Sequence, residues 1–237
     1  MAFNLAFEAF GLPYRWDEDI YGRLLRITGG QARLQAYLAE QGMPEAERDE
    51  LVPALHARKT AMLSEMVAEG VIEVRPGVRR LLDELTGAGC RLAVATTGSR
   101  GWVDGLLAHL LPGVELEVVV TGDEVSARKP DPEAFVVAVE RLGVDGAAVV
   151  AVEDSAEGLE AAKAAGLTCV VVTNGYTADH DLAAADLVLD GFGEPGSPAT
   201  VTADPLGVGC DGIVDVDVLE RVLAKASQSG GSSQSDQ

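Results

Sequence analysis

Residues 147–173 read AAVVAVEDSAEGLEAAKAAGLTCVVVT, two apolar runs separated by an alanine-rich segment. The runs, 147–152 and 168–173, are short and nearly continuous, and the segment between them, 155–165, has the apolar spacing of an amphipathic helix. Continuous apolar runs are typical of strands buried on both faces, which occur in parallel sheets covered by helices. This strand–helix–strand unit therefore predicts an α/β fold with a parallel sheet.

The same alternation of strands and helices continues on both sides of this unit. It predicts a doubly wound, Rossmann-like α/β core over residues 76–226. The further expected elements are strands at 91–95, 116–120 and 186–189 and helices at 101–111, 132–142 and 216–226.

The two ends of the chain have a different character from this core. Residues 1–75 show apolar residues at helical spacing and no strand pattern, so we expect a separate helical domain that includes a long helix at about 45–69. Residues 190–211 are rich in Gly, Pro, Ser and Thr and are expected to form a loop. The tail, 227–237, is rich in Ser, Gly and Gln and is expected to be disordered.

The composition excludes several classes of protein. The chain has 237 residues and a formal net charge of −20, which disfavours binding to nucleic acid or to an anionic membrane surface. With 47% hydrophobic residues it can bury a core, so global disorder is excluded. Lysine is rare beside arginine, and this acidic, lysine-poor surface fits either a salt-adapted (halophile) source or a GC-rich genome.

The cysteines and the N-terminus indicate the cellular compartment of the protein. Cys90, Cys169 and Cys210 have no CxxC spacing, and the first two start apolar runs, so we expect buried free thiols there. The N-terminus lacks the basic start and long apolar run of a signal peptide. We therefore expect a cytoplasmic protein. We also expect a monomer or a weak homodimer whose partner is a small molecule.

Polar residues follow three of the expected strands, at the sheet edge where open α/β folds bind ligands. The segment TTGSR (96–100) offers hydroxyls, helix-start amides and a guanidinium to an anion, or it is an ordinary helix cap. Lys129, fixed before Pro130, could neutralise a phosphate or carboxylate, or be a solvated lysine at a helix start. The adjacent carboxylates of Glu153 and Asp154 suit Mg²⁺, or they begin a helix.

The ordered set of VATTGS (94–99), ARKPDPEAF (127–135) and VEDSAEGLEAAKAAG (152–166) resembles the haloacid dehalogenase (HAD) superfamily of phosphohydrolases. The segments 2–30 and 176–196 resemble its CbbY-like branch of sugar-phosphate and phosphoglycolate phosphatases. The resemblance implies a HAD core at 76–226 beneath a helical cap at 1–75.

The resemblance also implies roles for individual residues. Thr96 would hold the transferring phosphoryl group, and Lys129 would pair with the nucleophile and the phosphate. Asp154, with Glu153, would orient Mg²⁺. The residues that would bind substrate lie in two groups, with Thr97, Gly98, Ser99 and Arg100 on the phosphate side and Gly29, Gly30 and Arg33 reading the sugar from the cap.

The sequence departs from the family pattern in two places. Gln31 stands where the CbbY type usually has Lys, so a cation that could meet a second phosphate is missing. Family members also open with a strand ending in DxDGT, whose first Asp is the nucleophile, and this sequence contains no DxDGT. We expect the first core strand, which is central in the family's sheet, to be absent from the given chain, and a complete protein to carry about 20 residues more. The alternative is a pseudoenzyme.

The function implied by the resemblance is Mg²⁺-dependent hydrolysis of a small phosphate monoester, a sugar phosphate, through an aspartyl-phosphate. Its nucleophile would be missing from the given N-terminus. A phosphomutase like β-phosphoglucomutase would use the same residues. A catalytically inactive sugar-phosphate binder is the alternative outside enzymes. We interpret His56, His109 and His180 as structural.

Overall fold

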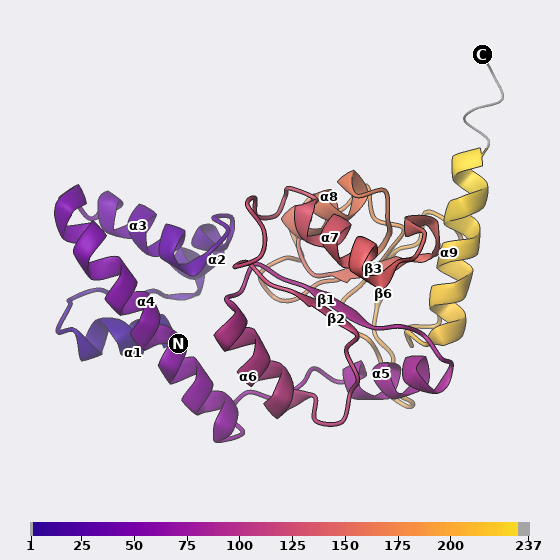
Figure 1. Cartoon of the computed structure of the whole chain (residues 1–237), viewed down its shortest axis with the longest axis horizontal. Helices are drawn as coiled ribbons and strands as arrows, with labels where there is room; N and C mark the ends of the chain where they lie inside the picture. The colour runs from indigo at the N-terminus through magenta and orange to yellow at the C-terminus, as the bar shows by residue number, and fades with distance from the viewer. Residues whose placement is uncertain (1, 232–237) are drawn as a thin grey trace, which may run out of the picture. The chain divides into compact units, whose positions relative to one another are not determined.

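The computed structural model describes residues 2–231, which form two compact units (Figure 1). The helical unit comprises residues up to 73 together with 97–112. The sheet unit comprises residues 74–96 and those from 113 onward. Among the described residues, we find no helix with the length and apolarity needed to cross a membrane.

The helical unit is built around a cluster of aromatic rings. Phe3 and Phe7, on one face of the first helix, are buried, and the Phe3 ring centroid lies 4.4 Å from that of Trp16. Asn4 fixes the loop that carries Trp16, because its side-chain amide donates to the Trp16 carbonyl at 2.8 Å and its oxygen accepts the Trp16 amide at 2.8 Å. Its helices α1 (Ala2–Ala9), α2 (Glu18–Leu25), α3 (Gly30–Glu40) and α4 (Glu45–Ala68) follow the helical pattern predicted for residues up to 75. It also contains α6 (Arg100–Leu110), a helix that the sequence predicted at 101–111 as part of the core.

The sheet unit has the predicted α/β architecture, with every expected strand present in shortened form. Its strands are β1 (Ala93–Ala95), β2 (Val118–Val120), β3 (Val150–Glu153), β4 (Thr168–Val172), β5 (Leu187–Leu189) and β6 (Val201–Ala203). Its helices are α5 (Val78–Gly87), α7 (Glu133–Leu142), α8 (Ala156–Ala164) and α9 (Val216–Gly231). The strand expected from 147 starts at Val150 because Gly146–Ala148 form a 3-10 turn.

Two expectations at the C-terminal side are wrong. The segment 190–211 is not all loop, because β6 pairs antiparallel with β5 at the edge of the sheet. Residues 227–231, expected to be disordered, continue helix α9, and the rest of the predicted tail lies outside the described residues. An edge strand needs neither a continuous apolar run nor two buried faces, so its three residues gave no strand pattern.

The strands lie in two separate sheets. β1 and β2 pair in parallel, and β3, β4, β5 and β6 form a second sheet in that order, parallel except at β6. Along residues 2–231 no strand pairs with the other edge of β1 or of β3. The expectation of strands buried on both faces holds for β4 and β5 and is wrong for β1 and β3, where Ala93 and Val152 are exposed. Within residues 2–231, each of these two strands has a paired neighbour on one side only.

The three cysteines are free, but they differ in environment. Cys169 in β4 is buried as expected, and burial raises the pKa of its thiol to about 12. Cys90, also expected to be buried, is exposed instead, in the segment between α5 and β1.

Two arginines at the start of the sheet unit donate hydrogen bonds to backbone carbonyls in its C-terminal half. The Arg75 guanidinium donates to the carbonyls of Thr173 at 2.8 Å and Asp190 at 3.0 Å, at the ends of β4 and β5. Arg80 in α5 donates to the carbonyls of Gly193 and Val214, both at 3.0 Å. Each guanidinium therefore links the residues that begin the sheet unit to segments that follow its later strands.

We expect Arg80→Ala to lower the free energy of unfolding by about 3 kcal/mol, because it leaves half-buried carbonyls without their charged donor. Urea denaturation followed by circular dichroism measures this loss. Arg15→Ala, at an exposed position, is the control and is expected to change stability by less than about 0.5 kcal/mol. Equal stability of the two variants would show that the hydrogen bonds of Arg80 do not stabilise the fold.

Candidate active site

One lysine joins the carboxyl ends of two strands in the sheet unit. Lys129, which follows β2, donates from Nζ to the carbonyl of Ala95 at 3.0 Å, at the end of β1. The same ammonium forms an ion pair with Glu153, the last residue of β3. The two side chains are mostly buried, with 14% and 10% of their surface exposed. The structure therefore brings together the polar groups that the sequence placed after β2 and β3.

The loop before Lys129 is held by the first turn of α7. Glu133 accepts the backbone amides of Ser126 at 2.8 Å and Ala127 at 2.7 Å, and these bonds lower the pKa of its carboxyl. The Lys129 ammonium lies 4.6 Å from the centroid of the Phe135 ring, in the first turn of the same helix. The ammonium is thereby fixed by a ring and two oxygen partners, rather than solvated.

Glu153 is constrained on both sides of its carboxyl group. Burial raises its pKa, and the nearby Lys129 ammonium offsets part of that rise. Its Oε2 lies against the first turn of α8, where a Cβ at Gly158 would come within 1.9 Å of it. Glycine at this position leaves room for the carboxylate, and Ser155 caps the helix by accepting the Gly158 amide at 3.2 Å.

Asp154 has a different environment from its neighbour. It is exposed, and its Oδ2 accepts a hydrogen bond of 3.1 Å from the side-chain amide of Asn174, which follows β4. Asn174 was not among the predicted site residues, although it lies just beyond the carboxyl end of a strand, where open α/β folds bind ligands. Thr96 follows β1, and its amide donates to the Val120 carbonyl at 2.9 Å.

The carboxylates fit a magnesium ion better than a transition metal. The described residues contain no cluster of three or more His, Cys, Asp or Glu side chains that could enclose a metal. Mg²⁺ is commonly held by one or two carboxylates, with waters and substrate phosphates completing its shell. Asp154 can supply such a ligand, whereas Glu153 is engaged by Lys129.

A second group of predicted site residues lies in the helical unit. Gly29 has a φ of 99°, which favours glycine, and a Cβ at Gly30 would approach the His56 ring to 2.7 Å. Arg33 donates from Nε to the Ile27 carbonyl at 2.9 Å, so this loop is tied to the helix that follows it.

Lys59 of α4 is a cation that the sequence analysis did not select as a site residue. Burial lowers the pKa of its ammonium, and the charge of Arg33 lowers it further. Its Nζ lies 5.3 Å from the centroid of the Phe3 ring. The helical unit thus holds a half-buried cation within electrostatic reach of the Arg33 guanidinium.

The remaining predicted phosphate-side residues, 97–100, belong to the helical unit. Ser99 stands at the N-cap of α6 but makes no side-chain capping bond, and Arg100 pairs with Asp104 at 3.3 Å along the same helix. Thr97 and Gly98 are half-buried. Gln31 is exposed in the first turn of α3.

Known proteins are similar to this chain in sequence and in fold. Residues 2–166 match the family model of haloacid dehalogenase-like hydrolases. A CBBY-like protein of Arabidopsis thaliana is 41% identical over 82% of this chain, which spans 64% of that relative's length.

Two solved structures of CbbY from Rhodobacter sphaeroides are similar to this chain. The one in complex with phosphate is 38% identical with a TM-score of 0.73, over 82% of this chain and 87% of that one. A mutant in complex with xylulose-(1,5)bisphosphate is 37% identical with a TM-score of 0.72, over 80% and 85%.

We expect Lys129→Met to raise the pKa of Glu153 further, because it removes the ammonium that offsets burial. A carboxyl whose pKa in the folded state lies above its unfolded value stabilises the fold at low pH and loses that contribution as the pH rises through the folded pKa. The loss of stability, about 3 kcal/mol at neutral pH, should therefore shrink as the pH falls toward the ordinary value of 4.5.

Carboxyl NMR titration and urea denaturation between pH 5 and pH 7.5 measure the two effects. Lys225→Met, in α9, serves as the matched control. A loss of stability that is the same at every pH would rule out the coupling between Lys129 and Glu153.

Proposed function

The chain belongs to the haloacid dehalogenase-like hydrolases, as a CbbY-like member, and we propose that it is a magnesium-dependent phosphatase of a small sugar phosphate. The observation that carries this proposal is the Lys129 ammonium, fixed between Ala95 and Glu153 at the carboxyl ends of β1 and β3. A buried cation at this edge of an α/β sheet can neutralise the charge of a phosphoryl group in transfer.

We assign the chemistry to a few residues of the sheet unit. Lys129 neutralises charge on the phosphoryl oxygens, and Glu153 is a positioning residue that holds the ammonium in place. The Thr96 hydroxyl donates to a phosphoryl oxygen. Asp154, oriented by Asn174, holds the metal ion, with Glu153 beside it. When bound, Mg²⁺ supplies further positive charge to the phosphate.

The attacking carboxylate is the component that this sequence does not identify, because it contains no DxDGT motif. By the resemblance, an Asp attacks phosphorus, the sugar hydroxyl leaves, and water then cleaves the aspartyl-phosphate. We propose that Lys129, Thr96 and Asp154 bind the phosphate and neutralise its charge.

We propose that residues of the helical unit select the sugar-phosphate substrate. We assign residues 1–75 as the cap and 76–226 as the core, with Gly29, Gly30 and Arg33 reading the sugar. Lys59 adds a second cation close to Arg33. Proteins of the CbbY type usually have a Lys at the position of Gln31, which carries no charge. Because a CbbY mutant was solved with a sugar bisphosphate, we propose a sugar phosphate as the substrate class, with Lys59 meeting its distal anionic or hydroxyl group.

The first test measures hydrolysis of sugar phosphates by the purified protein. We expect Lys129→Ala and Asp154→Asn to lower kcat/KM for sugar-phosphate hydrolysis by about 1,000-fold, a loss of about 4 kcal/mol in transition-state stabilisation. Arg128→Ala and Glu160→Gln, which remove exposed charges next to each site, are the controls. Phosphate release measures turnover, and near-normal rates in either site variant would refute the assignment.

The same protein tests the phosphomutase alternative. A mutase interconverts sugar-phosphate isomers, whereas a phosphatase releases inorganic phosphate, so both products are followed in one assay. Isomer formation faster than phosphate release would favour the mutase.

The second test concerns the helical unit. We expect Lys59→Ala to raise KM about tenfold with little change in kcat, because it removes a contact made equally in the ground state and the transition state. Arg58→Ala, whose side chain forms an exposed ion pair with Glu65, is the neighbouring control. Equal KM values for wild type and Lys59→Ala would exclude Lys59 from substrate binding.

A further inference from the structure

The loop that follows β4, residues 174–180, contacts the segment of Asp154 at two points. At one end of the loop, Asn174 donates from Nδ2 to Asp154 Oδ2 at 3.1 Å. At the other end, His180 accepts the backbone amide of Ala156 on its Nδ1, also at 3.1 Å. Ala156 is the first residue of α8. The 174–180 loop therefore holds both the carboxylate of Asp154 and the backbone just beyond it.

The bond to His180 provides a partner for the start of α8. The first amides of a helix have no acceptor within the helix. Ser155 accepts the Gly158 amide at 3.2 Å, and the imidazole of His180 accepts the Ala156 amide. The His180 side chain is 12% exposed, and Glu157 Oε2 lies 4.0 Å from Nδ1, too far for a hydrogen bond. Because Nδ1 accepts, the ring proton of the neutral imidazole is on Nε2.

The 174–180 loop is held in shape by hydrogen bonds around Thr177, which is buried. The Thr177 hydroxyl accepts the Asn174 amide at 3.0 Å, and the Thr177 carbonyl accepts the His180 amide at 3.1 Å. Asn174 Oδ1 accepts the Tyr176 amide at 2.8 Å, which fixes the orientation of the side chain whose Nδ2 meets Asp154. A short series of hydrogen bonds thus connects His180 to Asn174.

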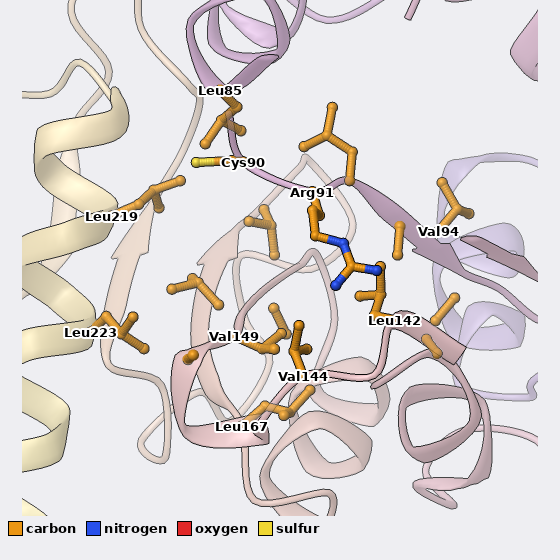
Figure 2. Close-up of a pocket in the computed structure, with 18 of the residues that line it drawn as sticks. Leu85, Cys90, Arg91, Val94, Leu142, Val144, Val149, Leu167, Leu219 and Leu223 are labelled. Atoms are coloured by element: carbon orange, nitrogen blue, oxygen red, sulfur yellow. The ribbon is translucent and has the colours of Figure 1, made fainter. Parts of the chain in front are cut away.

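The two adjacent carboxylates, Glu153 and Asp154, have different surroundings. Glu153 borders the apolar cavity of the sheet unit, which is also lined by Leu142 of α7 and Leu219 of α9 (Figure 2). Asp154 does not line this cavity and is exposed. Burial and an ion pair fix Glu153, whereas the orientation of Asp154 depends on the 174–180 loop.

We propose that His180 is a positioning residue for Asp154 and thereby sets the affinity of the protein for its metal ion. This inference rests on the proposed function, in which Asp154 holds Mg²⁺. The lone pair of Nδ1 anchors the 174–180 loop to α8, and the anchored loop presents Asn174 to the carboxylate. Residues that orient a metal ligand change metal affinity about 10- to 100-fold when they are altered. His180 acts in this way without touching the metal.

The first experiment replaces His180 in three ways. His180→Leu keeps the size of the side chain but removes the acceptor. His180→Asn places an oxygen close to the position of Nδ1, whereas His180→Gln places it close to that of Nε2. We expect the Leu and Gln variants to raise the Kd for Mn²⁺ about tenfold, and the Asn variant to stay within about twofold of wild type.

Mn²⁺ alone is the probe, because it takes the same oxygen ligands as Mg²⁺ and its binding is measured by water-proton relaxation. Asp154→Asn identifies the part of the binding that this carboxylate provides, since a net charge of −20 attracts cations elsewhere. His109→Leu, at an exposed position in α6, is the matched control and should leave the Kd unchanged. Circular dichroism checks that each variant is folded.

The second experiment measures the contacts without any metal. Hydrogen exchange at the Ala156 backbone amide and at the Asn174 side-chain amide should become about tenfold faster in His180→Leu and His180→Gln. Both rates should remain near wild type in His180→Asn and in His109→Leu. NMR spectroscopy follows the two amides separately.

The order of the variants decides between positioning and packing. If His180 only filled space, Leu would preserve the Mn²⁺ affinity better than Asn, and that order would overturn the inference. Wild-type affinity in all three variants would also overturn it, while the proposed function would stand, because Asp154 would still bind the metal. Equal Mn²⁺ binding by wild type and Asp154→Asn would instead refute the proposed metal site, and the inference would fail with it.

Discussion

The contact of Lys129 with Ala95 and Glu153 is the interaction on which the sheet unit depends most. It joins the carboxyl end of a two-stranded sheet to that of a four-stranded sheet, across a gap that no strand in residues 2–231 bridges. The same ammonium is the cation proposed for phosphate binding. Stability and chemistry therefore share one group, and Glu153, buried against Gly158, is the residue that holds it.

The strands and helices of the sheet unit could be predicted because a parallel sheet covered by helices leaves strong local patterns. The valine runs at β2, β3 and β4 and the helix between β3 and β4 are such patterns. The exposure of Val152 could not be predicted, because an apolar run shows what a strand is able to bury, whereas its actual burial depends on neighbours far away in sequence. The short strand β6 was missed for the related reason that an edge strand needs little apolar sequence.

The candidate site was only partly predictable. Lys129, Glu153 and Asp154 follow strands directly, and topology alone brings such positions to one edge of a sheet. The division of labour between the two carboxylates depends on which of them faces Lys129, and that is settled by packing against α8. Lys59 gave no signal, because a single lysine on a long helix resembles any solvated position until Phe3 and Arg33 are placed around it.

The net charge of −20 also affects how molecules of this protein behave toward one another. Strand edges such as that of β6, at the border of the four-stranded sheet, are templates for cross-β association between chains. Mutual repulsion between molecules that each carry a net charge of −20 opposes that association. Because the Debye length falls to about 3 Å at 1 M salt, this colloidal protection weakens as ionic strength rises. The acidic surface therefore opposes association through the sheet edge, and this protection is most effective in dilute salt.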